Sequence, residues 1–201
     1  MRLAETGLHE VPAGRIAAVV TCLEMREPPA LPAVEPPPDT RLRYWQRPEP
    51  EGYRELYRAV GERWLWFSRL LLSDEALRAI LHDPAVEVRV VETDGRAVGL
   101  LELDRRRFPE IELAFFGLVP ACTGRGYGRW LIAEAVRLAF AHGPSRFWVH
   151  TCTLDHPAAL PLYIRSGFTP YARFVEIVED PRLTGLLPRD AAPHVPLIEV
   201  P

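Results

Sequence analysis

The sequence predicts an α/β (α+β) domain in which a mixed, mostly antiparallel central sheet carries helices on both faces. Two observations support this fold class. Segments with the alternation and β-branched residues of strands are interspersed with segments of helical periodicity, in the order β-β-α-α-β-β-β-α-β-α-β. The length of 201 residues, with 48% hydrophobic and 25% charged residues, suits one soluble globular domain with appendages.

Residues 1–40 are predicted to contain a strand over 16–25 and a proline-rich connector. Eight prolines lie between residues 28 and 50, and the fixed φ and missing N–H of proline exclude regular helix and central strand there. Strand 16–25 is too apolar for a free tail. We therefore expect it to pair with an exposed sheet edge, in this chain or in a partner.

The main domain is expected to begin with a short strand at Arg41, followed by two helices and a hairpin. From Tyr53 to Trp64, apolar residues recur at i, i+3, i+4, i+7 and i+11, which places them on one helix face. Ser73 is typical of the N-cap of a second, shorter helix. A hairpin with an Asp-Gly turn should then join strands over 86–93 and 97–103.

The second half of the domain is predicted to alternate strands and helices. Its first strand is almost entirely apolar, which suits burial on both faces. The expected elements are strand 111–119, helix 126–142, strand 147–153, helix 157–166 and strand 171–178. The main domain should thus span 41–178. The extension 179–201 is broken by prolines and leaves room for a final edge strand over 196–200.

The composition excludes several classes of protein. All 24 basic residues are Arg, so a nucleotidase loop with Gly-Lys-Ser/Thr, a lysine Schiff base and a kinase lysine are all ruled out. The three cysteines have no zinc or redox spacing, and no metal site is expected. A net charge of −3 does not favour nucleic-acid binding, and neither a membrane span nor a secretory signal is visible. We expect a cytoplasmic protein.

The segment 119–129 lies between a predicted strand and a predicted helix. Its alternate glycines, Gly124, Gly126 and Gly128, let the backbone approach a ligand closely. Their N–H groups lie at the positive end of the helix, which is an arrangement that binds phosphate. A dinucleotide-binding turn would need another glycine spacing and an acidic residue at the end of the next strand, and this sequence has neither.

Residues 112–129 resemble the acetyl-CoA signature of the GNAT N-acetyltransferase superfamily, in which Gln/Arg-x-x-Gly-x-Gly/Ala follows a strand. The run from His156 to Phe168 is similar to the family's Asn-x-x-Ala-x-x-Leu-Tyr-x-x-x-Gly-Phe. The resemblance covers about 41–178 and implies the acetyltransferase fold with acetyl-CoA as cosubstrate. Thr123 and His156 depart from the family pattern, which usually has Gln or Arg at the first position and Asn at the second.

The resemblance also implies a set of residues that bind coenzyme A. Arg125 and Arg129 would flank the pyrophosphate, or they are simply exposed. The Val119 N–H would polarise the thioester carbonyl, and His156 would contact the pantetheine arm. The full set is Leu118, Val119, Thr123, Gly124, Arg125, Gly126, Tyr127, Gly128, Arg129 and His156.

Two residues are candidates for the chemistry, because transfer from a thioester to an amine needs a base and a proton for the thiolate. Glu112 lies in an apolar strand, where desolvation makes a carboxylate a stronger base. By resemblance, it falls where histone-acetylating members of the family place their base. Tyr163 would be the general acid in the family. The alternatives are an ion pair of Glu112 with Arg105–Arg107 and a core role for Tyr163.

The expected acceptor is a primary amine of a small molecule or peptide. Trp64, Trp66 and Phe67 lie where this family builds its acceptor pocket, and they form either a cation-binding wall or ordinary aromatic core. His150 either relays a proton through water or is structural. Two rival functions stay open: a non-catalytic acyl-CoA-binding or regulatory module, and a transferase that uses a longer acyl donor. The sequence also leaves a homodimer open.

Overall fold

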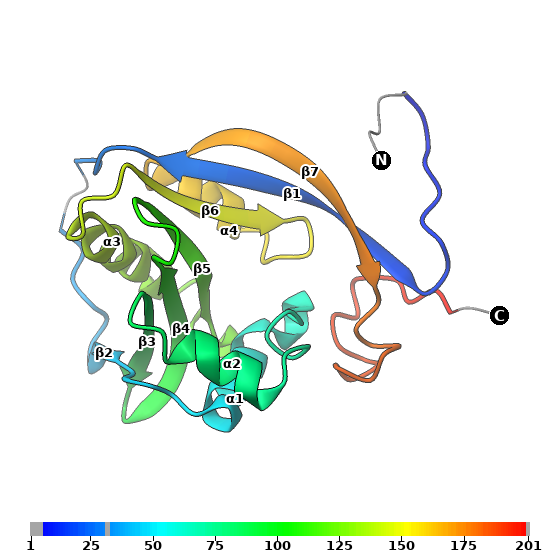
Figure 1. Ribbon diagram of the computed structural model, residues 1–201, viewed down its shortest axis with the longest axis horizontal. Helices are drawn as coiled ribbons and strands as arrows, with labels where there is room; N and C mark the ends of the chain where they lie inside the picture. The colour runs from blue at the N-terminus through cyan, green and yellow to red at the C-terminus, as the bar shows by residue number, and fades with distance from the viewer. Residues whose placement is uncertain (1–5, 31–32, 200–201) are drawn as a thin grey trace.

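The computed structural model describes residues 6–30 and 33–199. Within these residues seven strands form one sheet in the order β2-β3-β4-β5-β6-β1-β7, with β5 and β6 parallel and all other neighbours antiparallel (Figure 1). The strands are β1 (Arg15–Met25), β2 (Thr40–Tyr44), β3 (Val86–Thr93), β4 (Arg96–Asp104), β5 (Glu110–Leu118), β6 (Arg146–Cys152) and β7 (Thr169–Glu179). The helices are α1 (Pro50–Gly61), α2 (Asp74–Leu81), α3 (Tyr127–Phe140) and α4 (Ala159–Arg165), with 3₁₀ turns η1 (Glu62–Trp64) and η2 (Pro120–Cys122). No helix in this described part of the chain is long and apolar enough to span a bilayer.

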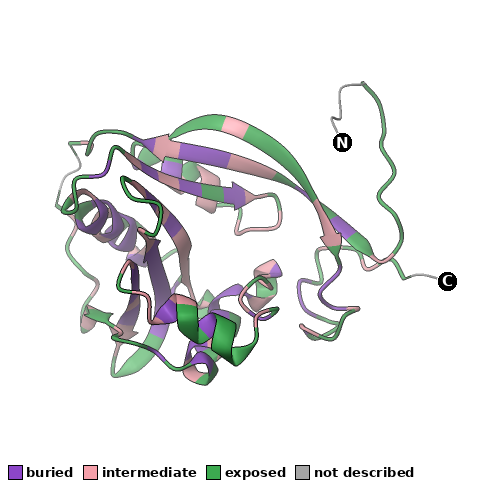
Figure 2. Cartoon of the chain, viewed as in Figure 1, coloured by how far each residue is buried: buried purple, intermediate pink, exposed green. Residues whose placement is uncertain are grey.

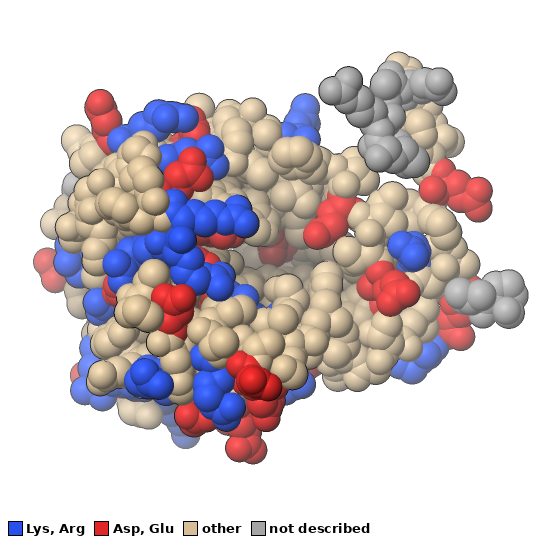
Figure 3. All heavy atoms as spheres, in the orientation of Figure 1, with Lys and Arg blue, Asp and Glu red and all other residues tan. Residues whose placement is uncertain are grey.

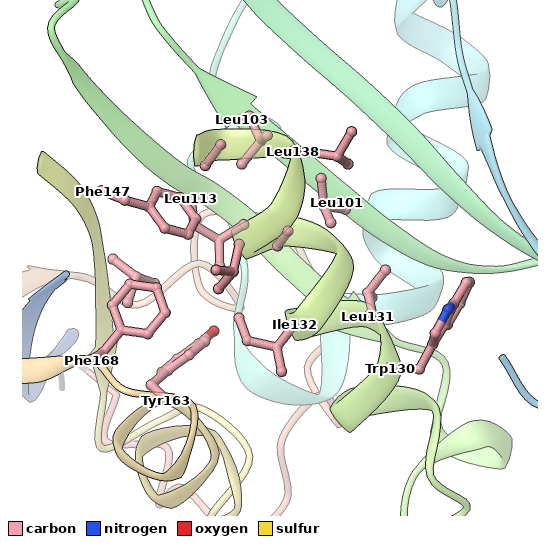
Figure 4. Close-up of a cluster of buried hydrophobic side chains, with 14 of the residues drawn as sticks. Leu101, Leu103, Leu113, Trp130, Leu131, Ile132, Leu138, Phe147, Tyr163 and Phe168 are labelled. Atoms are coloured by element: carbon pink, nitrogen blue, oxygen red, sulfur yellow. The ribbon is translucent and has the colours of Figure 1, made fainter. Parts of the chain in front are cut away.

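Two clusters of buried side chains cover the two faces of the sheet. One lies under α3 and α4 and contains Leu131, Phe147 and Phe168 (Figure 4). The other lies under α1, α2 and the chain beyond β7, and it contains Tyr53 and Tyr57. Helices therefore lie on both faces of the mixed sheet, and the predicted fold class is confirmed. Figure 2 shows that buried residues concentrate in β3, β4 and α3, whereas β7 is mostly exposed.

The sheet opens between β5 and β6. These strands pair only at their starts, where residues 110–112 lie opposite residues 146–148. Beyond that point β5 follows β4 as far as Leu118, while β6 follows β1. Burial of β5 on both faces was expected, but only Ile111 and Leu113 are fully buried, because the later residues border this opening.

The N-terminal strand β1 lies inside the sheet and not at its edge. It pairs with β6 on one side and with β7 on the other, so the expected pairing with the sheet is found within this chain, although in the interior of the sheet and not at an exposed edge. Alternate residues of β1, such as Ile16 and Ala18, are buried. The strand is therefore the only described partner of β7, and it holds β7 to the rest of the molecule.

The chain after β7 folds into turns. Arg182 and Asp180 form an ion pair whose side chains are each only 2% exposed, and the Arg182 guanidinium also donates to the Ala191 and Val195 carbonyls. The edge strand considered over 196–200 is wrong for its described residues 196–199, which form no strand. This local ion-pair network organises the segment instead of sheet pairing.

Candidate active site

A cavity of about 310 Å³ lies where β5 and β6 diverge. Residues 113–118 of β5 form its middle wall. We call the part next to α3 and α4 the loop side; it is lined by Phe116, Leu118, Thr123, Gly124, Gly128, Leu162 and Tyr163. We call the opposite part the aromatic side; its rings are Tyr57, Trp64, Trp66, Phe67 and Phe115. One continuous space thus connects segments that are far apart in the sequence.

The loop before α3 presents backbone donors to the loop side. Gly124 and Gly126 have φ values of 74° and 90°, and an added Cβ would meet no atom within 4 Å at either position. The N–H groups of residues 124–128 precede the first intrahelical bonds of α3, and no partner for them lies in the described chain. Free N–H groups at a helix N-terminus bind anions, so this loop is suited to a diphosphate.

The amide groups of β5 face the opening differently from the prediction. The Val119 N–H donates to the Val98 carbonyl at 2.9 Å, so it is not free to polarise a thioester. Successive N–H groups of a strand point to opposite sides. The Leu118 N–H therefore points toward the side from which β6 has diverged, as does that of Phe116. The assignment of this role to the Val119 N–H is wrong because Val119 still belongs to the β4–β5 ladder.

The other predicted coenzyme residues divide into exposed and buried side chains. Arg125 and Arg129 are exposed and have no ion-pair partner among the described residues. Tyr127 is buried in the core under α3, with its hydroxyl 3.5 Å from the Thr93 hydroxyl. The Thr123 hydroxyl donates to the Pro120 carbonyl at 2.7 Å and so shapes the loop itself. Because its side chain is buried, Tyr127 can contact a ligand only through its backbone.

Tyr163 reaches into the cavity from α4. Its ring packs edge-on against Phe116 and Phe168, and its hydroxyl makes no hydrogen bond to another described residue. Figure 4 shows this hydroxyl directed away from α4, between Phe168 and Ile132. Burial, followed by the charge of Asp155, raises the pKa of Tyr163, so the phenol is protonated at neutral pH. Tyr163 thus belongs both to the buried core and to the residues that line the cavity.

His150 and Glu112 form a pair at the point where β5 and β6 part. His150 Nδ1 lies 3.6 Å from Glu112 Oε1, and the His150 side chain is 49% exposed. His150 lines the cavity, whereas Glu112 lies behind it beside Trp148. The neighbouring Glu112 carboxylate raises the pKa of His150, partly opposed by desolvation. No ion pair joins Glu112 to Arg105–Arg107 in the described chain, so its neighbour is the histidine.

The aromatic side is built around Trp66. Its ring lies 5.4 Å from both Tyr57 and Phe115, and Gly61 leaves room for it, since a Cβ there would lie 2.3 Å from the Trp66 ring. Trp64 packs edge-on against His156 at 5.0 Å. Nδ1 of His156 accepts the Ala158 N–H at 3.0 Å, so this histidine stabilises the turn that precedes α4. Burial of the hydroxyl raises the pKa of Tyr57 to about 12.

Asp155 links the end of β6 to Trp66 of the aromatic side, and the sequence did not identify it. One carboxylate oxygen accepts the Thr151 hydroxyl at 2.7 Å and the Cys152 N–H at 2.8 Å. The other accepts the Trp66 indole N–H at 3.2 Å. A single carboxylate thus ties the end of β6 to the segment after α1. An Asp-containing turn after a strand was visible in the sequence, but its partner 89 residues away was not.

A buried ion pair under the aromatic side was also missed. Glu102 is fully buried and pairs with Arg69, while the Tyr53 hydroxyl donates to it at 2.5 Å. The Arg69 guanidinium also lies over the Phe115 ring at 4.9 Å. The signal available was a lone acid in an otherwise apolar strand. The network fixes the loop after η1 to the central strand β4.

The model of the acetyltransferase (GNAT) family matches residues 36–168, which is more than half of the chain. The chain belongs to this family. Members are acyltransferases that use acetyl-CoA as cosubstrate, and the donors of the loop before α3 fit its diphosphate. Among the residues described, no group of three or more His, Cys, Asp and Glu could hold a metal ion. Searching the curated proteins gives no match.

Solved structures with the same fold include several GNAT proteins. A GCN5-related N-acetyltransferase from Sphaerobacter thermophilus matches with a TM-score of 0.60 and 20% identity over 84% of this chain and 53% of that one. A GCN5-related N-acetyltransferase from Kribbella flavida matches with a TM-score of 0.56 and 19% identity over 86% of this chain and 63% of that one. A tandem GNAT protein from the clavulanic acid biosynthesis pathway matches with a TM-score of 0.54 and 16% identity over 86% of this chain and 55% of that one. The chain spans about half to two thirds of these structures, and the likeness concerns the fold.

Proposed function

We propose that this GNAT protein transfers the acetyl group of acetyl-CoA to a primary amine of a small molecule or peptide, by direct attack in a ternary complex. One observation carries the proposal. The cavity at the divergence of β5 and β6 joins anion-binding backbone groups on the loop side to an aromatic pocket with a His–Glu pair on the other side. A donor thioester and an acceptor amine would meet at residues 113–118 of β5.

The loop side would hold the coenzyme. The free N–H groups of residues 124–128 would bind its diphosphate, with Arg125 and Arg129 adding charge at the surface. The open edge of β5 would accept the pantetheine arm as an added strand, through the N–H of Leu118. The N–H of Phe116, one step earlier on the same edge, is then in position to polarise the thioester carbonyl.

His150 would take the proton of the attacking amine, with Glu112 as its orienting partner. The assignment follows from position, since His150 lines the cavity and Glu112 lies 3.6 Å behind its ring. The carboxylate stabilises the imidazolium that forms when the amine loses its proton. This proposal keeps both residues suggested by the sequence but makes the histidine the group nearest to the acceptor.

Tyr163 would assist the departing sulfur. The amine nitrogen forms a bond to the carbonyl carbon, the carbon–sulfur bond breaks, and its electron pair remains on the sulfur. The Tyr163 hydroxyl would donate a hydrogen bond to this thiolate, which leaves as the thiol after it takes up, through solvent, the proton that His150 received from the amine. The amine has lost one proton to His150, so the products are an N-acetyl amide and free coenzyme A.

Turnover of acyl-CoA on a panel of amines, amino acids and peptides tests the proposal. Calorimetry first measures acetyl-CoA binding, and thiol release with mass spectrometry of the products then measures transfer. We expect binding together with products that carry one added acetyl group. Binding without transfer from any acyl-CoA would support the non-catalytic module. Transfer from butyryl-CoA but not acetyl-CoA would support the longer donor, and no binding at all would overturn the cofactor assignment.

A further inference from the structure

The charged side chains of the cavity lining are acidic, whereas Arg63 and Arg69 lie against the outer sides of the aromatic rings. The lining contains the carboxylates of Asp155 and Glu176 and no Arg among the described residues. A neighbouring polar pocket, which contains Glu112, has three carboxylates against two Arg. Figure 3 shows the hollow in this face, with Arg on its left margin and acidic residues on its right. Negative charge in the lining itself disfavours an anionic acceptor and favours a cationic one.

The two carboxylates of the cavity lining have different tasks. Both oxygens of Asp155 accept hydrogen bonds from the protein, so it acts as a structural link. Glu176 has no hydrogen bond or ion pair within the described chain. It is therefore the carboxylate in this cavity that is available to a ligand.

The sheet register fixes the direction in which Glu176 points. Glu176 lies opposite Ala18 of β1, and His150 lies opposite Cys22 of the same strand. Because side chains alternate between faces with a period of two, Ala18 and Cys22 point to one face. Glu176 and His150 thus share that face, offset by four residues along β1, which is roughly 13 Å, and by two strand spacings across the sheet, which is roughly 10 Å. The two groups can therefore contact opposite ends of one small molecule.

The walls between these two ends are apolar. Rings of Trp64, Trp66 and Phe67 offer surface for a hydrocarbon chain and can attract a cation within about 6 Å of their faces. The cavity of about 310 Å³ lies at the small end of ligand pockets and must also hold the thioester. A slender acceptor fits these limits better than a bulky one.

We propose that the acceptor is an aliphatic diamine or polyamine, with one amino group at His150 and a second, cationic amino group held by Glu176. This inference rests on the proposed function, because it names the substrate of the same cavity. Glu176 is then a specificity residue that contacts the substrate away from the reacting atoms. It sets the preferred distance between the two amino groups and leaves the acetyl transfer step itself unchanged.

The test uses α,ω-diamines of three to ten carbons and the n-alkylamines of equal length, with acetylated product measured by mass spectrometry. We expect one diamine length to be preferred over its monoamine by about fivefold in kcat/KM, the scale of an exposed ion pair. In Glu176→Gln this preference should vanish through KM, with kcat nearly unchanged. The matched control is Glu179→Gln, an exposed carboxylate on the opposite face of β7, which should keep the preference.

Other outcomes would overturn the inference. These are equal use of monoamines, a preference that survives Glu176→Gln, or better use of basic peptides than of any diamine. If no amine is acetylated, calorimetry of 1,8-diaminooctane and octylamine with the coenzyme A complex separates the two proposals. Diamine binding that needs Glu176 would keep the subsite and contradict the transferase function, whereas equal or absent binding of the two amines would overturn the subsite.

Discussion

The two sides of the cavity are built in different ways. The loop side takes its donors from residues 124–128, which are consecutive and act through backbone N–H groups. The aromatic side takes single side chains from distant segments, such as Trp66 after α1 and Asp155 after β6. Backbone N–H groups are present whatever side chains the loop carries, whereas the shape of the aromatic side depends on the identity of each contributing residue. The coenzyme side should therefore tolerate side-chain changes that the acceptor side does not.

Tyr163→Phe should give the largest effect on turnover. The ring and its contacts with Phe116 and Phe168 stay, so acetyl-CoA affinity should hardly change. Losing one donor to a developing anion costs about 10²–10³-fold in kcat. Steady-state kinetics on a verified amine checks this, and Tyr44→Phe, an exposed tyrosine of β2 that does not line the cavity, is the control. Wild-type turnover in Tyr163→Phe would remove the tyrosine from the mechanism.

Gly126→Asp should weaken coenzyme A binding by about 10–100-fold. The substitution places a carboxylate beside the N–H groups that would bind the diphosphate and strains a residue with φ of 90°. Gly143→Asp is a matched control, because Gly143 has φ of 64°, equally open space and lies beyond the other end of α3. Calorimetry should find the affinity loss in the first variant alone. Equal affinities in two folded variants would place the diphosphate elsewhere.

Asp155→Asn should disturb the aromatic side while sparing the loop side. The amide turns one accepting oxygen into a donor that faces another donor, which costs about 1–3 kcal/mol of folding free energy. KM for the amine should rise several-fold as Trp66 loses its partner, and acetyl-CoA affinity should stay. Denaturant unfolding and kinetics measure both, with Asp94→Asn in an exposed turn as the control. An equal loss of acetyl-CoA affinity would show that the aromatic side and the loop side do not respond independently.

Glu112→Gln should lower the pKa of His150, since the neighbouring Glu112 carboxylate is the main cause that raises it. The raised pKa stabilises the fold below the unfolded pKa of His, and this contribution is lost as pH rises through the folded pKa. The variant should thus lose more stability at pH 5 than at pH 9. The rise of kcat/KM with pH should move to lower pH, because neutral His150 forms earlier. NMR titration measures the shift, and Glu110→Gln should leave it in place.

The sequence predicted the elements and the free N–H groups of the glycine loop, for a physical reason. Periodicity and glycine spacing are local, so the sheet, its helices and the free N–H groups near Gly126 could be inferred from short windows. Short windows could not show that β1 lies inside the sheet and not at its edge, because that position depends on pairing with β6, more than 100 residues later. The Val119 error has the same origin, since the register with Val98 is a tertiary property.

The aromatic side was predicted only in part. Trp64, Trp66, Phe67 and His150 line the cavity as expected, because a helix end and a strand position identify them. Asp155, Glu102 and Glu176 were not identified, since an acid in a sequence carries no sign of whether it is buried, satisfied or free. Only contacts between distant segments distinguish these three roles.

A crystal structure of the protein with acetyl-CoA would test the central claim most directly. We predict the diphosphate on the N–H groups of residues 124–128, the pantetheine arm along β5 at Phe116–Leu118, and the sulfur beside the Tyr163 hydroxyl. The acetyl group should then face His150 across the opening between β5 and β6. A coenzyme bound outside this opening, or one whose acetyl group points away from the aromatic side, would contradict the account.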